Sequence, residues 1–170
     1  LYIAFIDYEK AFDSVETSAV MQALQNRGVE EPYVKILEDI YRNCTATIVI
    51  HKVSNKITIR KGVRQGDTIS PMLFPACLQE VFRGLKWEQL GIRVNGEYLN
   101  NLRFTDGIAL LSHKRDELQS MINDLGRHSK TVDLKINMQK TKIMLKSLAK
   151  NQQFTIGSEV LEVVKEYTYL

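Results

Sequence analysis

The sequence opens with Leu1-Tyr2-Ile3-Ala4-Phe5-Ile6, an apolar run of strand-forming residues that ends at Asp7. A short run of this kind predicts a strand buried in a sheet. Residues 13–27 and 32–44 follow with apolar side chains at helical spacing, and residues 45–61 alternate with a period of two, which is typical of a hairpin. A buried strand placed ahead of two helices and a hairpin excludes an all-helical fold.

The rest of the sequence also mixes helix and strand patterns. Helices are expected over 70–85, with Pro75 inside the helix, and over 114–132. Asn95-Gly96 and Asp106-Gly107 predict two-residue hairpin turns. Short alternating runs predict further strands at 134–137, 141–145, 154–156 and 160–164. The expected fold class is therefore α+β, with helices packed on one face of a mainly antiparallel sheet.

Composition limits the class of protein. The 170 residues are 44% hydrophobic and 25% charged, which fits one folded domain and excludes a disordered tail or a disulfide scaffold. No apolar run is long enough for a membrane span, and no secretory signal is visible. Cys44 and Cys77 are far apart, which suits a reducing compartment. We therefore expect an intracellular protein of the cytoplasm and nucleus, with no membrane partner. Because Leu1 stands where Met would, we expect a piece of a longer polypeptide.

Positive charge is concentrated in two blocks. The formal net charge is +3, but residues 127–150 carry +6 and residues 51–64 carry +5 with no acidic residue. Two basic blocks on a nearly neutral chain indicate a surface that faces a polyanion such as nucleic acid. Solvated lysine-rich faces would give the same pattern, and charge alone does not separate the two interpretations.

Two aspartates stand where metal chemistry would need them. Asp7 ends the first strand, and Asp106 lies in an expected hairpin turn about a hundred residues later. If the two strands are neighbours, both carboxylates emerge at one edge of the sheet, where they could hold divalent cations for phosphoryl transfer. Each aspartate also has an ordinary explanation, since aspartate often ends strands and Asp-Gly forms good turns.

Four stretches in order resemble the motifs of reverse transcriptases from non-LTR retrotransposons. The first motif matches residues 3–15, IAFIDYEKAFDSV, and the second matches residues 62–71, GVRQGDTISP. Residues 102–106, LRFTD, stand where an aromatic-x-Asp-Asp hairpin belongs, and residues 134–141, LKINMQKT, resemble the motif that follows. The resemblance implies a polymerase palm and covers essentially the whole chain.

The resemblance implies a catalytic centre. Asp7 and Asp106 would be catalytic metal ligands for two Mg²⁺ ions, with Mn²⁺ as a substitute. Lys140 matches the lysine that protonates the leaving pyrophosphate, although a lysine in a basic block is often only solvated.

The resemblance also implies a nucleotide site. Phe12 matches the aromatic steric gate that presses on the sugar and disfavours ribonucleotides; a core aromatic would explain this residue equally well. Gln65 and Gly66 would contact the incoming nucleotide, with Arg64 beside them. An ordinary connecting loop would also account for this stretch.

The resemblance implies partners and domain limits. An RNA template, a DNA primer and a dNTP would be bound, and the full-length protein would carry a fused endonuclease. Residues 1–170 would be a palm fragment, with the fingers motifs upstream and the thumb downstream both absent. Residues 45–61 would be a hairpin around Ser54-Asn55, inserted between the first two motifs, and residues 160–170 would be the truncated start of the primer grip.

One motif departs from the family pattern. The second aspartate of the aromatic-x-Asp-Asp hairpin is replaced by Gly107. We therefore expect an RNA-directed DNA polymerase by descent that is impaired in this copy, with the isolated chain inactive. Two alternatives stay open, a non-catalytic nucleic-acid-binding remnant and an inert pseudogene fragment.

Overall fold

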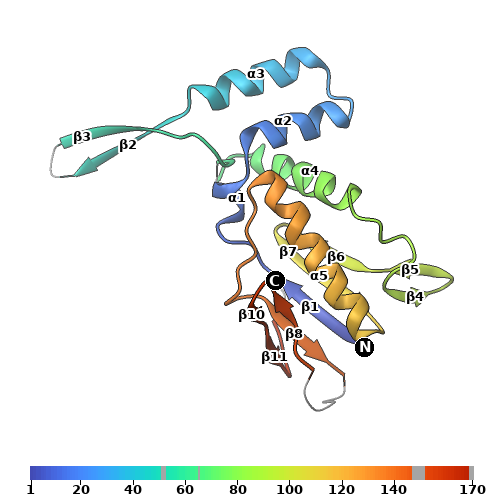
Figure 1. Cartoon of the computed structure of the whole chain (residues 1–170). Helices are drawn as coiled ribbons and strands as arrows, with labels where there is room; N and C mark the ends of the chain where they lie inside the picture. Colours follow the sequence, from blue (N-terminus) through green and yellow to red (C-terminus); the bar gives the residue numbers. More distant parts are fainter. Residues whose placement is uncertain (51–52, 65, 147–151, 169–170) are drawn as a thin grey trace. The chain divides into compact units, whose positions relative to one another are not determined.

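The structure is a computed structural model that describes residues 1–50, 53–64, 66–146 and 152–168 (Figure 1). The chain forms two compact units. Unit 1 consists of Leu1–Glu9 and Val81–Leu170, and unit 2 consists of Lys10–Glu80. No helix within the described ranges combines the length and apolar character that crossing a bilayer requires.

A five-stranded sheet forms the centre of unit 1. Its strands are β1 (Tyr2–Ile6), β6 (Asn101–Phe104), β7 (Gly107–Ser112), β8 (Lys142–Leu145) and β11 (Glu162–Val164). Their order in the sheet is β11-β8-β1-β7-β6. The pairs β8-β1, β1-β7 and β7-β6 are antiparallel, and only β11-β8 is parallel. The prediction of a mainly antiparallel sheet is confirmed, and β1 lies at its centre.

Helix α5 (Arg115–Ser129) packs against β1 and β7 in unit 1, as Figure 1 shows. Four of its apolar side chains are completely buried, and they recur at helical spacing: Leu118, Met121, Ile122 and Leu125. Completely buried apolar residues of the sheet, such as Ala4 and Ile143, belong to the same unit. A short 3₁₀ turn, η1 (Lys130–Val132), continues the helix. The apolar stripe expected over 114–132 is therefore confirmed, and it fastens α5 to the strand that Asp7 follows.

Two small hairpins complete unit 1. Strands β4 (Ile92–Val94) and β5 (Glu97–Leu99) are joined by Asn95-Gly96, as predicted. Both turn residues have positive φ, 50° and 93°, which is the conformation that an Asn-Gly turn favours. Strands β9 (Thr155–Ile156) and β10 (Glu159–Val160) form the other hairpin.

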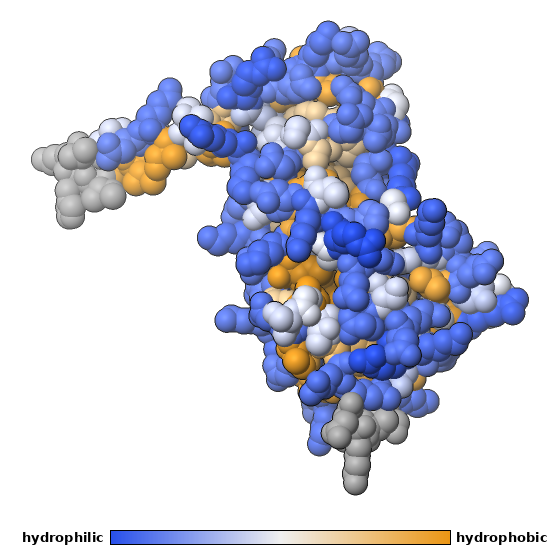
Figure 2. Space-filling view, in the orientation of Figure 1, coloured by the Kyte–Doolittle hydropathy of each residue, from blue (hydrophilic) through white to orange (hydrophobic). Residues whose placement is uncertain are grey.

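Unit 2 contains helices and one hairpin. Its elements are α1 (Ala11–Ser14), α2 (Thr17–Asn26), α3 (Glu31–Arg42), β2 (Thr45–Ile50), β3 (Val53–Thr58) and most of α4 (Ser70–Arg83). The register of the hairpin pairs Val49 with Ser54 and Ile48 with Asn55, so the expected turn at Ser54-Asn55 is wrong. Figure 2 shows an apolar stripe along this hairpin, where Ile48, Val49 and Ile57 are exposed.

The structure corrects three further local expectations. The single helix expected over 13–27 is two helices, because Val15 between them adopts an extended conformation (φ −58°, ψ 134°). The strand expected over 134–137 is reduced to one bridge between Ile136 and Tyr8, since a turn begins directly after it. The hairpin turn expected at Asp106-Gly107 lies one residue earlier, with Gly107 already the first residue of β7.

Candidate active site

The register of the sheet brings Asp7 and Asp106 together. Ile6, the last residue of β1, pairs with Ile108 of β7, so Asp7 leaves the ladder at the end of the sheet where β7 begins with Gly107. Asp106 directly precedes Gly107 in the turn that joins β6 to β7. Asp106 lies close enough to raise the pKa of Asp7 by repulsion between the two carboxylates. The sequence predicted that Asp7 and Asp106 would lie together only if their strands were neighbours. Within unit 1 the strands are neighbours, and the two carboxylates lie close to each other.

The turn that carries Asp106 is tight. Phe104 pairs with Gly107, which leaves Thr105 and Asp106 as its two central residues. Thr105 has a φ of +54°, a left-handed conformation that a β-branched residue rarely adopts. Phe104 is 68% exposed beside this turn. Because only two residues connect β6 to β7, the position of Asp106 at the edge of the sheet is closely restricted.

Asp7 is an unusual carboxylate. Its Oδ1 atom is buried and accepts no hydrogen bond, and the nearest cation is the Nζ atom of Lys140 at 3.6 Å. Burial is the main reason why the pKa of Asp7 is raised, and Asp106 adds to the effect, while Lys140 acts in the opposite direction. A buried carboxylate oxygen with an incomplete set of partners is well suited to bind a cation.

Hydrogen bonds fasten the Lys140 segment to Asp7. The backbone N–H of Asn137 donates to the carbonyl of Asp7 at 2.8 Å, and the N–H of Asp7 donates to the buried hydroxyl of Thr141 at 3.3 Å. The Oδ1 atom of Asn137 accepts the backbone N–H groups of Gln139 and Lys140, both at 3.1 Å. The sequence pattern pointed to Lys140 but not to Asn137 and Thr141 as members of the site. Their signal is the spacing Asn-x-x-Lys-Thr, since asparagine often closes such turns.

Two carboxylates are the acidic groups available at this site. Across the described ranges, no cluster of three or more His, Cys, Asp and Glu side chains could hold a metal ion. Magnesium needs only one or two protein carboxylates, because water and substrate phosphates complete its coordination. The buried Oδ1 atom of Asp7, which accepts no hydrogen bond, and the nearby Asp106 fit a hard divalent cation on the chemistry of their oxygen donors.

The candidate nucleotide residues lie in unit 2. Phe12 belongs to α1, and its ring stacks on that of Phe74 at 4.8 Å between centroids. The carbonyl of Phe12 accepts the N–H of Val63 at 2.6 Å, which joins α1 to the loop that contains Arg64. Gly66 is exposed and has a φ of +85°. Gln65 lies outside the described residues. Unit 2 therefore brings the Phe12 segment and the Arg64 loop side by side.

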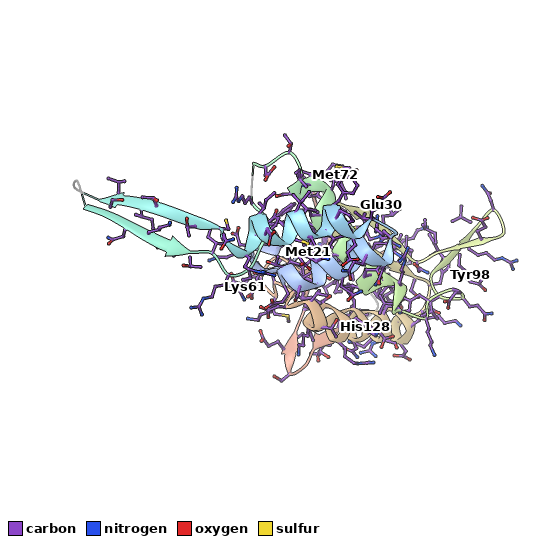
Figure 3. All side chains as sticks on the ribbon, turned by 90° about the horizontal axis from the view of Figure 1, so that it is seen from above. Met21, Glu30, Lys61, Met72, Tyr98 and His128 are labelled. Carbon is purple, nitrogen blue, oxygen red and sulfur yellow. The ribbon has the colours of Figure 1, made fainter. Side chains whose placement is uncertain are left out.

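Arg64 already has a partner. Its guanidinium donates from Nε and Nη2 to the Sγ atom of Cys44, at 3.3 and 3.1 Å. This contact raises the pKa of Arg64, so the guanidinium is charged at any ordinary pH. The pair lines a cavity of about 650 Å³ together with Asp13, Tyr41, Thr45, Ile59, Lys61, Gly62 and Val63. Figure 3 shows Lys61 near the base of the β2-β3 hairpin.

Comparison with known families decides the assignment. The family model described as "Reverse transcriptase (RNA-dependent DNA polymerase)" matches residues 1–170. The chain belongs to the reverse transcriptase family. Its relatives place this reverse transcriptase domain among those of non-LTR retrotransposons, as its motifs predicted.

Two curated relatives come from insects. The chain is 35% identical over 124 residues to the Retrovirus-related Pol polyprotein from type-1 retrotransposable element R2 of Nasonia vitripennis, a match that covers 72% of this chain and 12% of that protein. It is 28% identical over 181 residues to the Pol polyprotein of the type-2 element R2DM of Drosophila melanogaster, covering 99% of this chain and 17% of that protein. The reverse transcriptase chain thus spans less than a fifth of either relative.

Solved structures show the same fold. Apo telomerase from Candida tropicalis matches with a TM-score of 0.69 and 11% identity, over 95% of this chain and 31% of that chain. Telomerase from Candida albicans, in complex with a fragment of telomeric RNA, matches with a TM-score of 0.65 and 13% identity, over 95% and 30% of the two chains. The predicted α+β fold class with a palm-like arrangement is confirmed.

Proposed function

We propose that this reverse transcriptase chain is the palm of an RNA-directed DNA polymerase, which extends a DNA primer with dNTPs by copying an RNA template. The observation that carries the proposal is the convergence of Asp7 and Asp106 at one edge of the sheet through the β1-β7 register. Family membership supplies the reaction class. Asp7 and Asp106 are the proposed ligands of Mg²⁺ or Mn²⁺ in a two-metal site.

The chain's own residues have distinct roles in this proposal. When bound, divalent cations neutralise charge on the reacting phosphates. Asp7 and Asp106 would determine where the cations bind. The pairing of β1 with β7 and of β6 with β7 holds both residues at one edge of the sheet. Lys140 is the proposed proton donor to the leaving pyrophosphate, because its ammonium group lies at the site and is 66% exposed.

Unit 2 is the proposed source of nucleotide contacts. Phe12 is the candidate steric gate against the sugar, and Arg64, Gln65 and Gly66 are the candidate contacts to the triphosphate or base. A guanidinium group and exposed backbone N–H groups suit phosphate oxygens. Arg64 has Cys44 as its present acceptor, so binding a nucleotide would exchange a sulfur for a phosphate oxygen.

The remaining parts of the polymerase are proposed to lie in the rest of a longer protein. The insect relatives are several times longer than this chain, which leaves room for fingers, a thumb and a fused endonuclease. Residues 160–170 are the proposed start of the primer grip, and Tyr167 in this segment stacks on Phe5 of β1 at 4.2 Å between ring centroids. A protein that joins an RNA template to a DNA primer would act inside the cell, in the cytoplasm and nucleus.

Gly107 is the reason to propose an impaired enzyme. A second aspartate at this position would stand at the same edge of the sheet as Asp7, because residues 7 and 107 directly follow and precede the last pair of the β1-β7 ladder, Ile6 and Ile108. Glycine supplies no oxygen ligand there. Loss of one group that acts directly on the reacting centre lowers a rate by about two to four orders of magnitude in other enzymes.

Primer extension on poly(rA)/oligo(dT) with Mg²⁺ or Mn²⁺ tests the proposal. In a longer protein that includes the fingers and thumb, we expect slow dT incorporation that the Asp7→Ala and Asp106→Ala variants abolish. Lys35→Ala, which removes an exposed lysine of α3 outside both basic blocks, should leave the rate unchanged and serves as the matched control. Incorporation that survives both aspartate variants would contradict the assignment. Salt-sensitive binding of RNA that ignores metal and tolerates Asp7→Ala, with no synthesis, would favour a nucleic-acid-binding remnant instead.

A further inference from the structure

Lys140 and the proposed metal compete for one atom. The Nζ atom of Lys140 lies 3.6 Å from Oδ1 of Asp7, and this buried oxygen, which accepts no hydrogen bond, is the one that fits a divalent cation. An ammonium group and a divalent cation repel each other strongly at such short range. A divalent cation bound to the same oxygen therefore disfavours the observed position of the Lys140 ammonium and favours its movement away from Oδ1.

The side chain of Lys140 is free to make that movement. It is 66% exposed, and lysine carries its charge on a flexible four-carbon stem. The Lys140 ammonium is largely in solvent although the Asp7 side chain is only 23% exposed, and a solvent-screened pair of this kind contributes about 1 kcal/mol, or roughly fivefold in an equilibrium constant. A metal ion with two carboxylates to bind can overcome a competitor of that strength.

The backbone of Lys140 has no such freedom. Asn137 accepts the N–H of Lys140 with its side chain and donates its own N–H to the carbonyl of Asp7. The Thr141 hydroxyl, which accepts the N–H of Asp7, lies on the other side of Lys140 in the sequence. These hydrogen bonds hold the backbone of Lys140 at the site, whichever direction its ammonium group takes.

We propose that Lys140 is the resting counter-ion of Asp7, that a divalent cation displaces it from Oδ1, and that Asn137 is the positioning residue that keeps the displaced ammonium at the site. The inference rests on the proposed function, because it places the cation at Asp7. It adds an order of events: the proton donor is held on the carboxylate until metal arrives, and metal binding releases it toward the leaving group.

Binding of Mn²⁺ alone to the 170-residue chain tests the displacement, with free Mn²⁺ followed by electron paramagnetic resonance. No primer or nucleotide is needed. Lys140→Met removes the competing charge and keeps the length of the side chain, so we expect Mn²⁺ to bind up to about fivefold more tightly. Lys140→Arg keeps the charge and should give no tightening. Because Lys140 is exposed, neither variant should disturb folding, which a thermal melt can verify.

Lys135→Met is the matched control for a change in net charge. Lys135 lies in the same loop and is also exposed, but its ion pair is with Glu9, at 3.2 Å. Its removal should change Mn²⁺ affinity by less than about twofold, since screened charges act weakly at a distance. Equal tightening by Lys135→Met and Lys140→Met would overturn the inference, because it would show a general charge effect.

A double-mutant cycle tests the role of Asn137. Asn137→Ala loosens the turn, so in the wild-type background it should tighten Mn²⁺ binding by about twofold, a fraction of the full ion-pair effect. In the Lys140→Met background it should have no further effect. A change of the same size in both backgrounds would show that Asn137 has only a structural role and would overturn this part of the proposal.

Asp7→Asn separates the two possible failures. If this variant abolishes Mn²⁺ binding but Lys140→Met does not tighten it, the counter-ion inference is wrong and the proposed metal site stands. If wild type binds no Mn²⁺, or Asp7→Asn binds it as well as wild type does, the metal site and the inference fail together.

Discussion

The candidate residues of unit 1 and those of unit 2 are held in different ways. Asp7 and Asp106 are fixed by a ladder of strand pairs, and Oδ1 of Asp7 is left without a hydrogen bond. In unit 2, Phe12 stacks on Phe74 and Arg64 donates twice to Cys44. A sheet can therefore present a carboxylate oxygen that has an ion pair but no hydrogen bond, whereas the loop guanidinium already donates hydrogen bonds that a ligand must replace.

The largest test adds a carboxylate to the unit 1 site. Gly107→Asp, in a longer protein that includes the fingers and thumb, should raise the rate of primer extension by about a hundredfold or more. Gly107 is the first residue of β7, and the extended backbone of a strand is a conformation that aspartate also adopts. Gly107→Asn is the control, since it has a similar shape without the charge. Equal rates for the two variants would show that the added carboxylate is not a metal ligand.

The second test breaks the support of the unit 2 loop. Gly62 has a φ of +90°, and a Cβ atom there would lie 2.7 Å from the carbonyl oxygen of Asp13. Gly62→Ala should therefore lower the free energy of unfolding by about 2–3 kcal/mol, as measured by urea denaturation.

Gly66→Ala is the matched control for this change. Gly66 has a similar φ of +85°, but a Cβ atom added there would have nothing within 4 Å, so only backbone strain applies and the loss should be about 1 kcal/mol. Under conditions where the Gly62→Ala chain stays folded, its Mn²⁺ affinity should match that of wild type. A large fall in affinity would contradict the view that unit 1 holds the metal site by itself.

The third test concerns the partner of Arg64. Cys44→Ala removes the sulfur that accepts both guanidinium hydrogen bonds, so the free energy of unfolding should fall by about 1 kcal/mol. Cys44→Ser retains an acceptor and should recover part of that loss. Urea denaturation of the two variants measures the difference. The same loss in both would show that the contact with Arg64 contributes nothing to stability.

The smallest expected effect is that of Asp7→Asn on stability without metal. Because the fold raises the pKa of Asp7, the folded chain binds this proton more tightly than the unfolded chain does. The stabilisation from protonated Asp7 is present below the unfolded pKa and is lost as the pH rises through the raised pKa. At neutral pH the buried charge is therefore unfavourable, and Asp7→Asn should stabilise the chain by a few tenths of a kcal/mol, up to about 1.

Unfolding in urea with a chelator at two pH values checks this sign. The difference between Asp7→Asn and wild type should shrink toward zero near pH 3, where the wild-type carboxyl is protonated in both states. A variant that is less stable than wild type at pH 7 would show that the attraction of Lys140 outweighs the burial of Asp7.

Local patterns predicted the elements whose form depends on neighbours in the sequence. The apolar run before Asp7, the buried stripe of α5 and the Asn95-Gly96 turn are all present as expected. Expectations failed where a single residue changes the direction of the backbone. Val15 divides a helix in two, and the turn after Ile136 ends a strand before it pairs along its length.

The sequence by itself determined the strand that Asp7 ends, the family motifs and the types of residue available for chemistry. Only the tertiary structure decided that β1 lies between β7 and β8, which sets Asp7 beside Asp106 and Lys140. Periodicity reports which face of an element is buried, but it carries no information on which distant strand becomes the neighbour. That choice depends on hydrogen bonding and packing between segments about a hundred residues apart, and the site exists only once they have paired.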